Sequence, residues 1–454
     1  MTSHSPPRAR TPERVLAPEQ AIQTFAESRQ GYSRAEAVAE ASRAAGIDLS
    51  AASAACPFGV DLTRLVAEVA EGDFDGALAT VLAAHRWPGT MGRHCGKYCE
   101  SHATPDDGGE PVALGLLERA AADHGSRSLY EVDLPPPRPG KRVAIVGMGS
   151  AGIAVAFRLR QHGHFVSMFD PLPKAGGMTL VGYPSFRLPE TVVALENDLE
   201  GWGIKTHHET PIDRSLMEEL IDTFDAVVIC TGTHREVPLR VPGEDAQGVI
   251  PALEFLTAFK LGRPPAIGRS VAVIGAGHTA QDASRTCRRL GANATIFYRR
   301  TAEEMPVDPS KRDRFVSMLA AEGIEYVFSA AVTRIITDED RVVGIEVAET
   351  RSVGDPGAAE LTLEVVAGTQ RIVACDTVIK ATGVYADTDF VPSEIQRTSD
   401  QLIFVDEATY MTTLPGVFAV GTVIGTKKTV WALKTGLDAA EAVHDFLEVQ
   451  DGRN

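Results

Sequence analysis

The stretch KRVAIVGMGSAGIAVAFRLRQHG, residues 141–163, decides the fold class. It opens with a run typical of a buried strand, passes through the glycine turn GMGSAG and continues as a helical segment. A strand, a glycine-rich turn and a helix in this order open a βαβ dinucleotide-binding unit. Gly147 permits the tight turn, Gly149 allows a pyrophosphate to approach the backbone, and Gly152 lets the helix pack on the strand. The helix N-terminus then presents its positive dipole to the phosphates.

The same order recurs near residues 270–290, as SVAVIG, GAGHTAQD and ASRTCRRLG. Two such units predict two bound nucleotides. The second unit looks inserted into the first, because KATG (380–383) and the ending LPGVFAVGTVIG (414–425) look like the first unit resuming.

The chain before the first unit is predicted to be helical. Residues 1–16 are rich in Pro, Ser and Arg without an apolar period, which predicts a disordered tail. From residue 17 to 134 the pattern is Ala-rich and helical, and the prolines of DLPPPRPGK (133–141) then end any helix and mark a domain boundary. The predicted fold class is α/β, with a helical N-terminal domain (17–134) followed by two nested dinucleotide-binding domains, the first at 140–265 and 385–454 and the second at 266–384.

Composition excludes several classes of protein. The 454 residues carry a net charge of −17, and nucleic-acid binding needs a basic face. No stretch of about 18 apolar residues predicts a membrane span, and the N-terminal segment lacks a secretory apolar run, so we expect a cytoplasmic protein. The six cysteines are too few for a disulfide framework. Among them only Cys56, Cys95 and Cys99 look clustered, and we interpret Cys230, Cys287 and Cys375 as small buried apolar residues.

The first unit is predicted to bind FAD. Asp170 closes the second strand, FVSMFD, where a carboxylate can bind ribose hydroxyls; capping a turn is its alternative role. The glycine-containing segments AGGM (175–178) and CTGT (230–233) favour a flavin nucleotide, because they let backbone lie against it. The predicted residues here are Gly147, Gly149, Ala151, Gly152, Asp170, Gly176, Gly177, Met178, Thr231 and Gly232.

The second unit is predicted to prefer NADPH. Arg299 and Arg300 follow its next strand, at the position where an acid would bind a free ribose 2′-hydroxyl, and guanidinium groups pair well with a 2′-phosphate. The alternative is a solvated basic pair on a loop. The predicted residues are Gly275, Gly277, His278, Thr279, Ala280, Arg299, Arg300 and Gly383.

An ordered set of motifs resembles one enzyme family over nearly the whole chain from about residue 20. The set comprises ACPFGVD (55–61), GRHCGKYCESHA (92–103), EPVALGLLERAAAD (110–123), GMGSAG, AGGMTLVGYPSFRLP, GAGHTAQD, YRRTAEEMP and FAVGTVIG. It is similar to the small subunit of NADPH-dependent glutamate synthase and to the flavin-binding half of dihydropyrimidine dehydrogenase. The resemblance implies FAD, NADPH and iron–sulfur clusters in the helical domain.

Two departures from that family concern the clusters. The family carries two [4Fe–4S] clusters, but its upstream CxxCxxxxC run is replaced here by GIDLSAASAA (46–55), and Ala103 stands where the last cysteine belongs. The resemblance therefore implies that one cluster is lost. By position, the ligands of the remaining cluster are Cys56, Cys95, Cys99 and Glu118, with His102 as an alternative fourth ligand. The competing interpretation is a relic domain with buried structural cysteines.

A third departure concerns the flavin. The family ends its FAD site with a Gly-Asp step, whereas this chain has Gly421-Thr422. The neutral Thr422 hydroxyl can still form hydrogen bonds. A helix beginning near Thr429 and Val430 would direct its positive end toward the flavin. Arg187, Gly421, Thr422, Thr429 and Val430 complete the predicted FAD set.

Three functions are compatible with the sequence. The first is an electron-transfer module that takes electrons from NADPH through FAD and one [4Fe–4S] cluster to an acceptor protein or larger catalytic subunit, with a homo-oligomer possible. The second is a self-contained reductase acting on a small substrate near Tyr183 and Arg187. The third is a non-catalytic assembly subunit. No acid–base catalyst is evident in the sequence.

Overall fold

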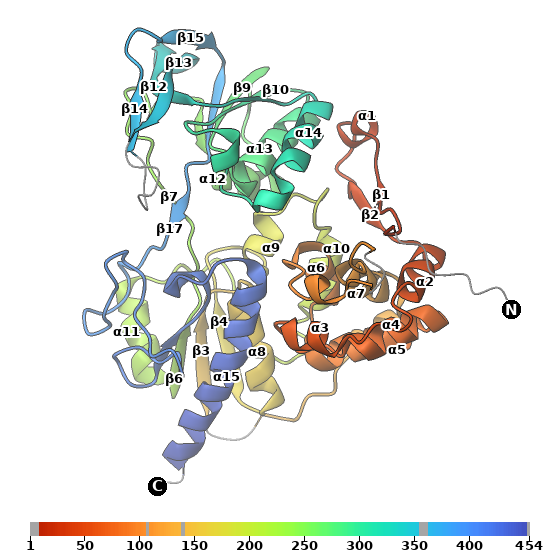
Figure 1. Ribbon diagram of the computed structural model, residues 1–454. Helices are drawn as coiled ribbons and strands as arrows, with labels where there is room; N and C mark the ends of the chain where they lie inside the picture. The colour runs from red at the N-terminus through yellow and green to blue at the C-terminus, as the bar shows by residue number, and fades with distance from the viewer. Residues whose placement is uncertain (1–8, 106–108, 138–140, 354–361, 452–454) are drawn as a thin grey trace, which may run out of the picture.

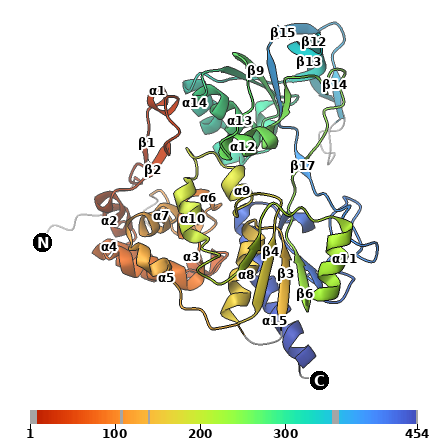
Figure 2. The ribbon, with the colours of Figure 1, turned by 180° about the vertical axis from the view of Figure 1, so that it is seen from behind.

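The computed structural model describes residues 9–105, 109–137, 141–353 and 362–451. Three parts are distinct in Figures 1 and 2: a helical N-terminal domain, a first nucleotide-binding domain beside it, and a second nucleotide-binding domain above both. Within these ranges no helix is long and apolar enough to cross a lipid bilayer.

The helical domain packs around a core of alanine, leucine and valine side chains. Its fourth helix begins at Asp61, whose carboxylate accepts the Arg64 N–H, and ends at the left-handed Gly72. Leu78 and Leu117 from two other helices are fully buried in the same core. The helices are α1 (Pro18–Ala21), α2 (Arg34–Ser42), α3 (Ser50–Ala55), α4 (Leu62–Glu71), α5 (Phe74–Ala84), α6 (Pro88–His94) and α7 (Leu114–His124), with η1 (Glu100–His102), η2 (Arg127–Tyr130) and the strands β1 (Arg14–Val15) and β2 (Arg29–Gly31).

The predicted disordered tail is wrong for the residues that the structure describes. Residues 9–16 run along the helical domain, and β1 pairs antiparallel with β2. The Arg10 guanidinium lies 2.5 Å from the Glu100 carboxylate. A distant ion pair and strand pairing thus order a segment whose local composition looks unstructured. Residues 1–8 of the predicted tail, and 138–140 of the predicted connector, lie outside the described residues.

The first nucleotide-binding domain is a five-stranded parallel sheet with the order β18-β6-β3-β4-β5. Helices α8 and α15 cover one face and α11 the other (Figures 1 and 2). Gly436 allows close packing of α15 on α8, because a Cβ there would lie 2.5 Å from the Ala151 carbonyl oxygen. The elements are β3 (Arg142–Val146), α8 (Ser150–Gln161), β4 (Phe165–Phe169), α9 (Met178–Val181), α10 (Glu190–Glu196), β5 (Lys205–His207), α11 (Arg214–Thr223), β6 (Ala226–Ile229), β18 (Val417–Ala419), η5 (Gly421–Ile424) and α15 (Thr429–Asp451).

The second nucleotide-binding domain has its own five-stranded parallel sheet, with the order β11-β10-β9-β16-β8, and a smaller antiparallel sheet. Helices α12 and α13 share the apolar core of the parallel sheet. The elements are β8 (Val249–Pro251), α12 (Ala252–Lys260), β9 (Ser270–Ile274), α13 (His278–Arg289), β10 (Asn293–Phe297), η3 (Ala302–Glu304), η4 (Pro309–Lys311), α14 (Arg312–Ala321), β11 (Glu325–Val327), β12 (Ala330–Asp338), β13 (Arg341–Val353), β14 (Thr362–Val365), β15 (Arg371–Ala374) and β16 (Thr377–Lys380).

The second domain is inserted into the first, but its first boundary differs from the prediction. The chain crosses between the domains at an antiparallel pair formed by β7 (Arg235–Glu236) and β17 (Val384–Tyr385). Strand β8 and helix α12 precede residue 266 and belong to the second domain, so the predicted boundary at 265–266 is wrong. The KATG segment likewise ends β16 of the second sheet, and the first sheet resumes only at β18. Both errors arise because the first and last strands of the inserted domain resemble strands of the host domain locally.

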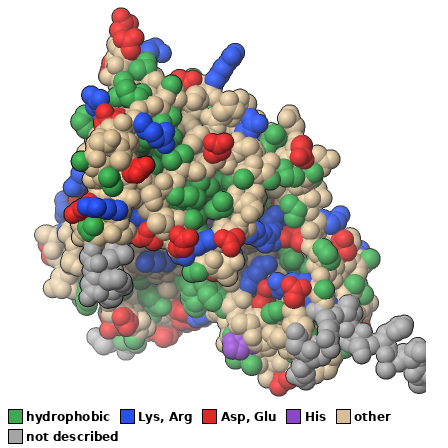
Figure 3. All heavy atoms as spheres, turned by 45° about the horizontal axis from the view of Figure 1, so that its top comes forward, with side chains coloured by type: hydrophobic (Ala, Val, Ile, Leu, Met, Phe, Trp, Pro, Cys, Tyr) green, Lys and Arg blue, Asp and Glu red, His purple; other side chains and the backbone are tan. Residues whose placement is uncertain are grey.

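Charges of both signs are interspersed over the face shown in Figure 3. On that face, the described side chains form no broad basic area of the kind that phosphate backbones require.

A buried carboxylate joins the first nucleotide-binding domain to the helical domain. Glu196, at the end of α10, is 1% exposed. It accepts the Thr90 hydroxyl at 2.5 Å and the backbone N–H groups of Gly89 and Thr90 at the start of α6. Burial raises the pKa of Glu196 to about 8, although these donors oppose the shift. The interface that positions α6, and with it Cys95, therefore contains a carboxyl group that titrates near neutral pH.

Replacing Glu196 by Gln should remove a pH dependence of stability. A folded-state pKa above the unfolded value of about 4.3 means that the proton is held more tightly in the folded chain. This contribution to stability is therefore fully present below the unfolded pKa and is lost as the pH rises through about 8. We expect a slope of up to about 1.4 kcal/mol per pH unit in the free energy of unfolding of the wild type between those values, and a flatter profile for Glu196→Gln. Urea unfolding over that pH range measures the free energy of unfolding, and Glu407→Gln, at an exposed position, is the control. Equal slopes in all three proteins would contradict the raised pKa of Glu196.

Candidate cofactor sites

The first glycine turn has the geometry that its sequence predicts. Gly147 has a φ of +109°, and a Cβ there would lie 2.5 Å from the Cys230 carbonyl oxygen. A Cβ at Gly152 would lie 2.1 Å from the Gly147 carbonyl oxygen. Neither position accepts a side chain, because backbone atoms cannot move aside as a flexible side chain could. These two glycines are therefore required by the fold itself.

Gly149 differs, because the protein leaves space beside it. A Cβ at Gly149 would meet only the Gly177 Cα, at 3.9 Å, and the backbone conformation is ordinary for any residue. Gly149 precedes α8, whose first N–H groups receive no side-chain cap. Across from it, Gly176 and Gly177 have positive φ values and Met178 is 39% exposed. Free N–H groups at the start of a long helix, beside open space, fit a pyrophosphate.

Asp170 lies at this turn but is engaged by the backbone. One carboxylate oxygen accepts the Met148 N–H at 2.7 Å and the other accepts the Leu172 N–H at 2.8 Å. Burial raises the pKa of Asp170, and the same two N–H groups oppose that shift. The structure thus shows Asp170 bracing the glycine turn, which was the alternative role. Each oxygen keeps a further lone pair for a ribose hydroxyl, so ribose binding stays a prediction.

The far end of the first site is built from β6, η5 and the start of α15. The Thr231 hydroxyl is buried and has no hydrogen-bond partner among the described residues, which fits a bound polar ligand. A Cβ at Gly232 would lie 3.2 Å from the Thr422 hydroxyl oxygen, so Gly232 faces that hydroxyl. A Cβ at Gly421 would lie 3.0 Å from the Ala151 Cβ. Thr429 begins α15 as predicted. Val430 is 1% exposed in the core, so only its backbone is available to a cofactor.

Arg187, which was predicted to bind FAD, pairs instead with a carboxylate of the second nucleotide-binding domain. Its guanidinium lies 2.5 Å from the Asp282 carboxylate on α13 and over the Tyr183 ring. The Tyr183 ring also packs on the His94 ring, at 4.2 Å between centroids, and its hydroxyl lies 3.3 Å from the Thr429 hydroxyl at the start of α15. Arg187 therefore links the two nucleotide-binding domains. Because both Arg187 and Tyr183 are occupied by neighbouring side chains, the segment that we considered for a small substrate is already packed.

The second glycine turn repeats the first. Gly275 has a φ of +125°, and a Cβ there would lie 2.2 Å from the Ala381 carbonyl oxygen. Gly277 begins α13 without a side-chain cap, His278 and Thr279 are exposed on its first turn, and Ala280 is buried against the sheet. Gly383, with a φ of +112°, lies beyond the end of β16. The uncapped helix end fits a second pyrophosphate.

The two predicted arginines follow β10 but have different surroundings. Arg299 is exposed, and its side chain makes no hydrogen bond or ion pair within the described chain. Arg300 lies 3.1 Å from the Glu304 carboxylate. Arg299 is therefore available for a phosphate as it stands, whereas Arg300 would have to exchange its partner.

The three clustered cysteines and Glu118 converge where the helical domain meets the first nucleotide-binding domain. Cys56 follows α3, Cys95 follows α6 and Cys99 precedes η1. Burial raises the pKa of all three thiols, that of Cys95 to about 12, and the negative charge of Glu118 acts on each of them. Thiols in such surroundings ionise when a cation binds them. The backbone N–H groups of Val60, Phe58 and Gly59 act in the opposite direction and lower the pKa of the Cys56 thiol.

The fourth position favours Glu118 over His102. Glu118 lies on α7 with a side chain 12% exposed, whereas His102 is exposed on η1. No group of three or more His, Cys, Asp and Glu side chains in the described chain is close enough to hold a single metal ion. A four-iron cluster spaces its ligands farther apart than a single ion does, and the donor set of three thiols and one carboxylate fits such a cluster. The ligand assignment stays a prediction.

One contact that the sequence analysis missed joins the cysteine loop to α15. Tyr98, between Cys95 and Cys99, accepts a hydrogen bond from the Trp431 indole N–H at 3.2 Å, and their ring centroids are 5.6 Å apart. The Lys428 ammonium lies 3.4 Å from the same hydroxyl. The only signal in the sequence was an aromatic residue between two cysteines, which does not identify its partner more than three hundred residues later.

Comparison with known proteins decides the family. The sequence model of the pyridine nucleotide-disulphide oxidoreductases matches residues 141–441. The chain belongs to this family. A second model, domain II of dihydropyrimidine dehydrogenase with its 4Fe-4S cluster, matches residues 21–129. These two matches confirm the predicted fold class and the predicted cofactor types, FAD, NADPH and a [4Fe–4S] cluster, so this oxidoreductase is an NADPH-linked flavin and iron–sulfur enzyme.

Relatives of this oxidoreductase confirm the predicted resemblance. It is 32% identical to the NADP(+)-dependent formate dehydrogenase subunit beta of Moorella thermoacetica, over 94% of this chain and 65% of the relative. It is 30% identical to the glutamate synthase [NADPH] small chain of Escherichia coli, over 94% of each chain. Among solved structures, Mycobacterium tuberculosis FprA in complex with NADPH shares the fold with a TM-score of 0.55 at 18% identity, over 70% of this chain and 86% of that one. The chain thus spans less than two thirds of the formate dehydrogenase subunit.

Proposed function

We propose that this oxidoreductase oxidises NADPH and delivers electrons, through FAD and a single [4Fe–4S] cluster, to a larger catalytic subunit or acceptor protein. The observation that carries the proposal is the meeting of Cys56, Cys95, Cys99 and Glu118 at the face of the helical domain that adjoins the flavin domain. When bound, the flavin accepts a hydride and releases electrons singly, and the cluster carries one electron at a time. A self-contained reductase would have no use for this four-residue set.

The roles of the protein's own residues follow from their positions. The uncapped starts of α8 and α13 bind the two pyrophosphates, and Arg299 binds the 2′-phosphate. The start of α15 directs its positive end at the flavin. Tyr98 and Trp431 hold the cysteine loop against that helix. Arg187 and Asp282 fix the second nucleotide-binding domain against the first. Each of these contacts positions a bound group, so the chain supplies binding and orientation.

A single cluster is supported by the packing around the places of the missing ligands. Ala52, within the segment that replaces the upstream cysteine run, and Ala103 are both 0% exposed. Ala103 packs in the same core as Cys99. Small apolar side chains fill the space, so no donor set for a second cluster is left at these two positions.

A partner subunit is supported by the names of the relatives. The relative from Moorella thermoacetica is one subunit of a formate dehydrogenase, and the relative from Escherichia coli is the small chain of a glutamate synthase. Which catalytic subunit this chain joins, whether it forms homo-oligomers, and its predicted cytoplasmic location are parts of the proposal. Anaerobic titration with NADPH tests it: flavin absorbance should bleach, and the paramagnetic signal of one reduced cluster should then appear. Bleaching without a cluster signal would favour the self-contained reductase.

Arg299→Ala should weaken the use of NADPH more than Arg300→Ala does. Only Arg299 has a free guanidinium, and a charge-assisted hydrogen bond to phosphate contributes on the order of 1.5–3 kcal/mol. We therefore expect KM for NADPH to rise about 10-fold or more in Arg299→Ala, with a smaller rise in Arg300→Ala. KM for NADH, which has no 2′-phosphate, is the internal control. Equal losses with both nucleotides would remove Arg299 from the phosphate site.

A further inference from the structure

We propose that His85 is a positioning residue that orients Glu118 as the fourth ligand of the cluster. This inference rests on the proposed function, because it presumes that Cys56, Cys95 and Cys99 hold a [4Fe–4S] cluster. It adds a residue that the motifs do not contain: His85 lies outside every segment on which the family resemblance depends.

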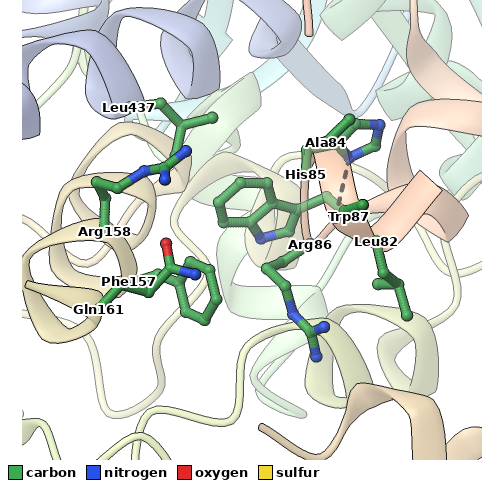
Figure 4. A pocket seen from close by; sticks show the side chains of 10 residues that line it. Leu82, Ala84, His85, Arg86, Trp87, Phe157, Arg158, Gln161 and Leu437 are labelled. Carbon is green, nitrogen blue, oxygen red and sulfur yellow. Dashed lines mark hydrogen bonds between the residues drawn. The ribbon is translucent and has the colours of Figure 1, made fainter. Parts of the chain in front are cut away.

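The surroundings of His85 fix which ring nitrogen carries its proton. His85 follows the last turn of α5 and is 4% exposed. Its Nδ1 accepts the Trp87 backbone N–H at 3.2 Å, the bond drawn as a dashed line in Figure 4. A nitrogen that accepts from a backbone N–H carries no proton, so the proton of the neutral ring lies on Nε2. Nε2 can therefore only donate.

The acceptor for that proton is Glu118. His85 Nε2 lies 3.2 Å from Glu118 Oε1, without the alignment of a full hydrogen bond. Both atoms are buried, and neither has a hydrogen-bond partner elsewhere in the described chain. An unpaired buried donor and an unpaired buried acceptor each destabilise the folded protein. Both costs are removed when His85 Nε2 donates a hydrogen bond to Glu118 Oε1. A carboxylate held by Oε1 would leave Oε2 to bind iron beside the cysteines, whose thiol pKa values the Glu118 charge raises.

The His85 ring packs against the loop that carries Cys56, another predicted ligand. The Phe58 ring packs on the His85 ring with centroids 4.4 Å apart, and the Phe58 backbone N–H lowers the pKa of the Cys56 thiol. Cys56, Phe58, His85 and Glu118 thus form one continuous chain of contacts. Outer partners of this kind fix the orientation of metal-binding side chains, and their loss costs about 10–100-fold in metal affinity or activity.

The cavity beside residues 82–87 does not indicate a ligand-binding role for His85. It has a volume of ≈ 40 Å³ and is lined by residues 82–87 together with Phe157, Arg158, Gln161 and Leu437. Figure 4 shows Trp87 directed toward Phe157 and Arg158, on the other side of the segment from the His85 ring. This volume admits a few water molecules, which is too small for a nucleotide or a metabolite.

Two substitutions of His85 distinguish a role in orienting Glu118 from a role in packing alone. His85→Asn retains an acceptor for the Trp87 N–H but is too short to donate to Glu118. His85→Gln is long enough to place an amide N–H near the position of Nε2. In anaerobically purified protein, we expect His85→Asn to lose iron to an added chelator about 10-fold faster or more and to show an altered spectrum of the reduced cluster in electron paramagnetic resonance. His85→Gln should keep the wild-type spectrum.

The controls separate this inference from the proposed function. His162→Asn is the same substitution at a histidine that faces a different carboxylate, Glu441, at 2.9 Å, and it should leave iron retention and the spectrum unchanged. Glu118→Ala should alter the spectrum. If Glu118→Ala alters it and His85→Asn does not, the positioning role is wrong while the cluster assignment stands. A His85→Asn protein that is less heat-stable but keeps a wild-type spectrum would also overturn it. Wild-type protein without iron would overturn both proposals.

Discussion

Gly149→Val should purify as a folded protein that lacks FAD but keeps the absorbance of its cluster. In the protein alone, the Cβ of the valine side chain would meet only the Gly177 Cα at 3.9 Å, and the φ of −83° is ordinary for valine. With FAD present, that side chain would occupy the place where the pyrophosphate approaches the start of α8. We expect flavin content to fall to near zero while the circular dichroism spectrum and the unfolding transition stay close to those of wild type. Flavin release after heating measures the content.

Gly152→Ala is the matched contrast. Its Cβ would lie 2.1 Å from the Gly147 carbonyl oxygen, so it should destabilise the fold itself and not only the cofactor site. A fully flavinated Gly149→Val protein would show that the pyrophosphate does not lie at this turn. An unfolded Gly149→Val protein would show that the space beside Gly149 is filled by protein.

Cys95→Ser should abolish the cluster while leaving the flavin in place. Wild-type protein purified without oxygen should contain about four iron and four sulfide per chain. Serine has nearly the size of cysteine, so the substitution removes a thiolate while the contact of residue 95 with the core of the flavin domain is retained. The broad visible absorbance of the cluster should disappear, bleaching of the flavin by NADPH should persist, and electron delivery to a partner should stop. Iron analysis and absorbance during NADPH titration measure these outcomes.

Cys375→Ser is the control for Cys95→Ser, because Cys375 is a buried thiol in the second nucleotide-binding domain. It should retain iron. Iron that persists in Cys95→Ser, or iron that is lost equally from Cys375→Ser, would remove Cys95 from the ligand set.

Local motifs predicted the glycine turns because a strand, a tight glycine turn and a helix follow one another within a short stretch of sequence. Gly147 and Gly275 each face a backbone carbonyl oxygen just after a neighbouring strand, Gly152 faces the Gly147 carbonyl oxygen of its own turn, and any chain that makes this turn meets the same constraints. The type of fold and the cofactors followed from these turns and from the family resemblance. The structure also brings together the four predicted cluster residues, although their spacing in the sequence says nothing about distances.

The sequence could not reveal features that depend on distant partners. Asp170 accepts N–H groups of its own turn, and Arg187 pairs with Asp282 across a domain boundary. Glu196 binds the start of α6, and His85 faces Glu118 from another helix. Each of these residues has an ordinary local context, and its role comes from tertiary packing. The domain boundary near residue 265 was misplaced for the same reason, since strand pairing alone shows that β8 belongs to the second sheet.

The insertion between β7 and β17 has a consequence for synthesis of the chain on the ribosome. The second nucleotide-binding domain closes its parallel sheet with β16, which is translated before β18 and α15. That domain can therefore fold while the first is incomplete, since nascent domains fold as units from the N-terminal side. Until the last segment emerges, β6 lacks its β18 neighbour and the apolar face of α8 lacks α15. The newborn protein thus exposes an unpaired strand edge and an apolar helix face together, and this stage of synthesis is where chaperone binding should be concentrated.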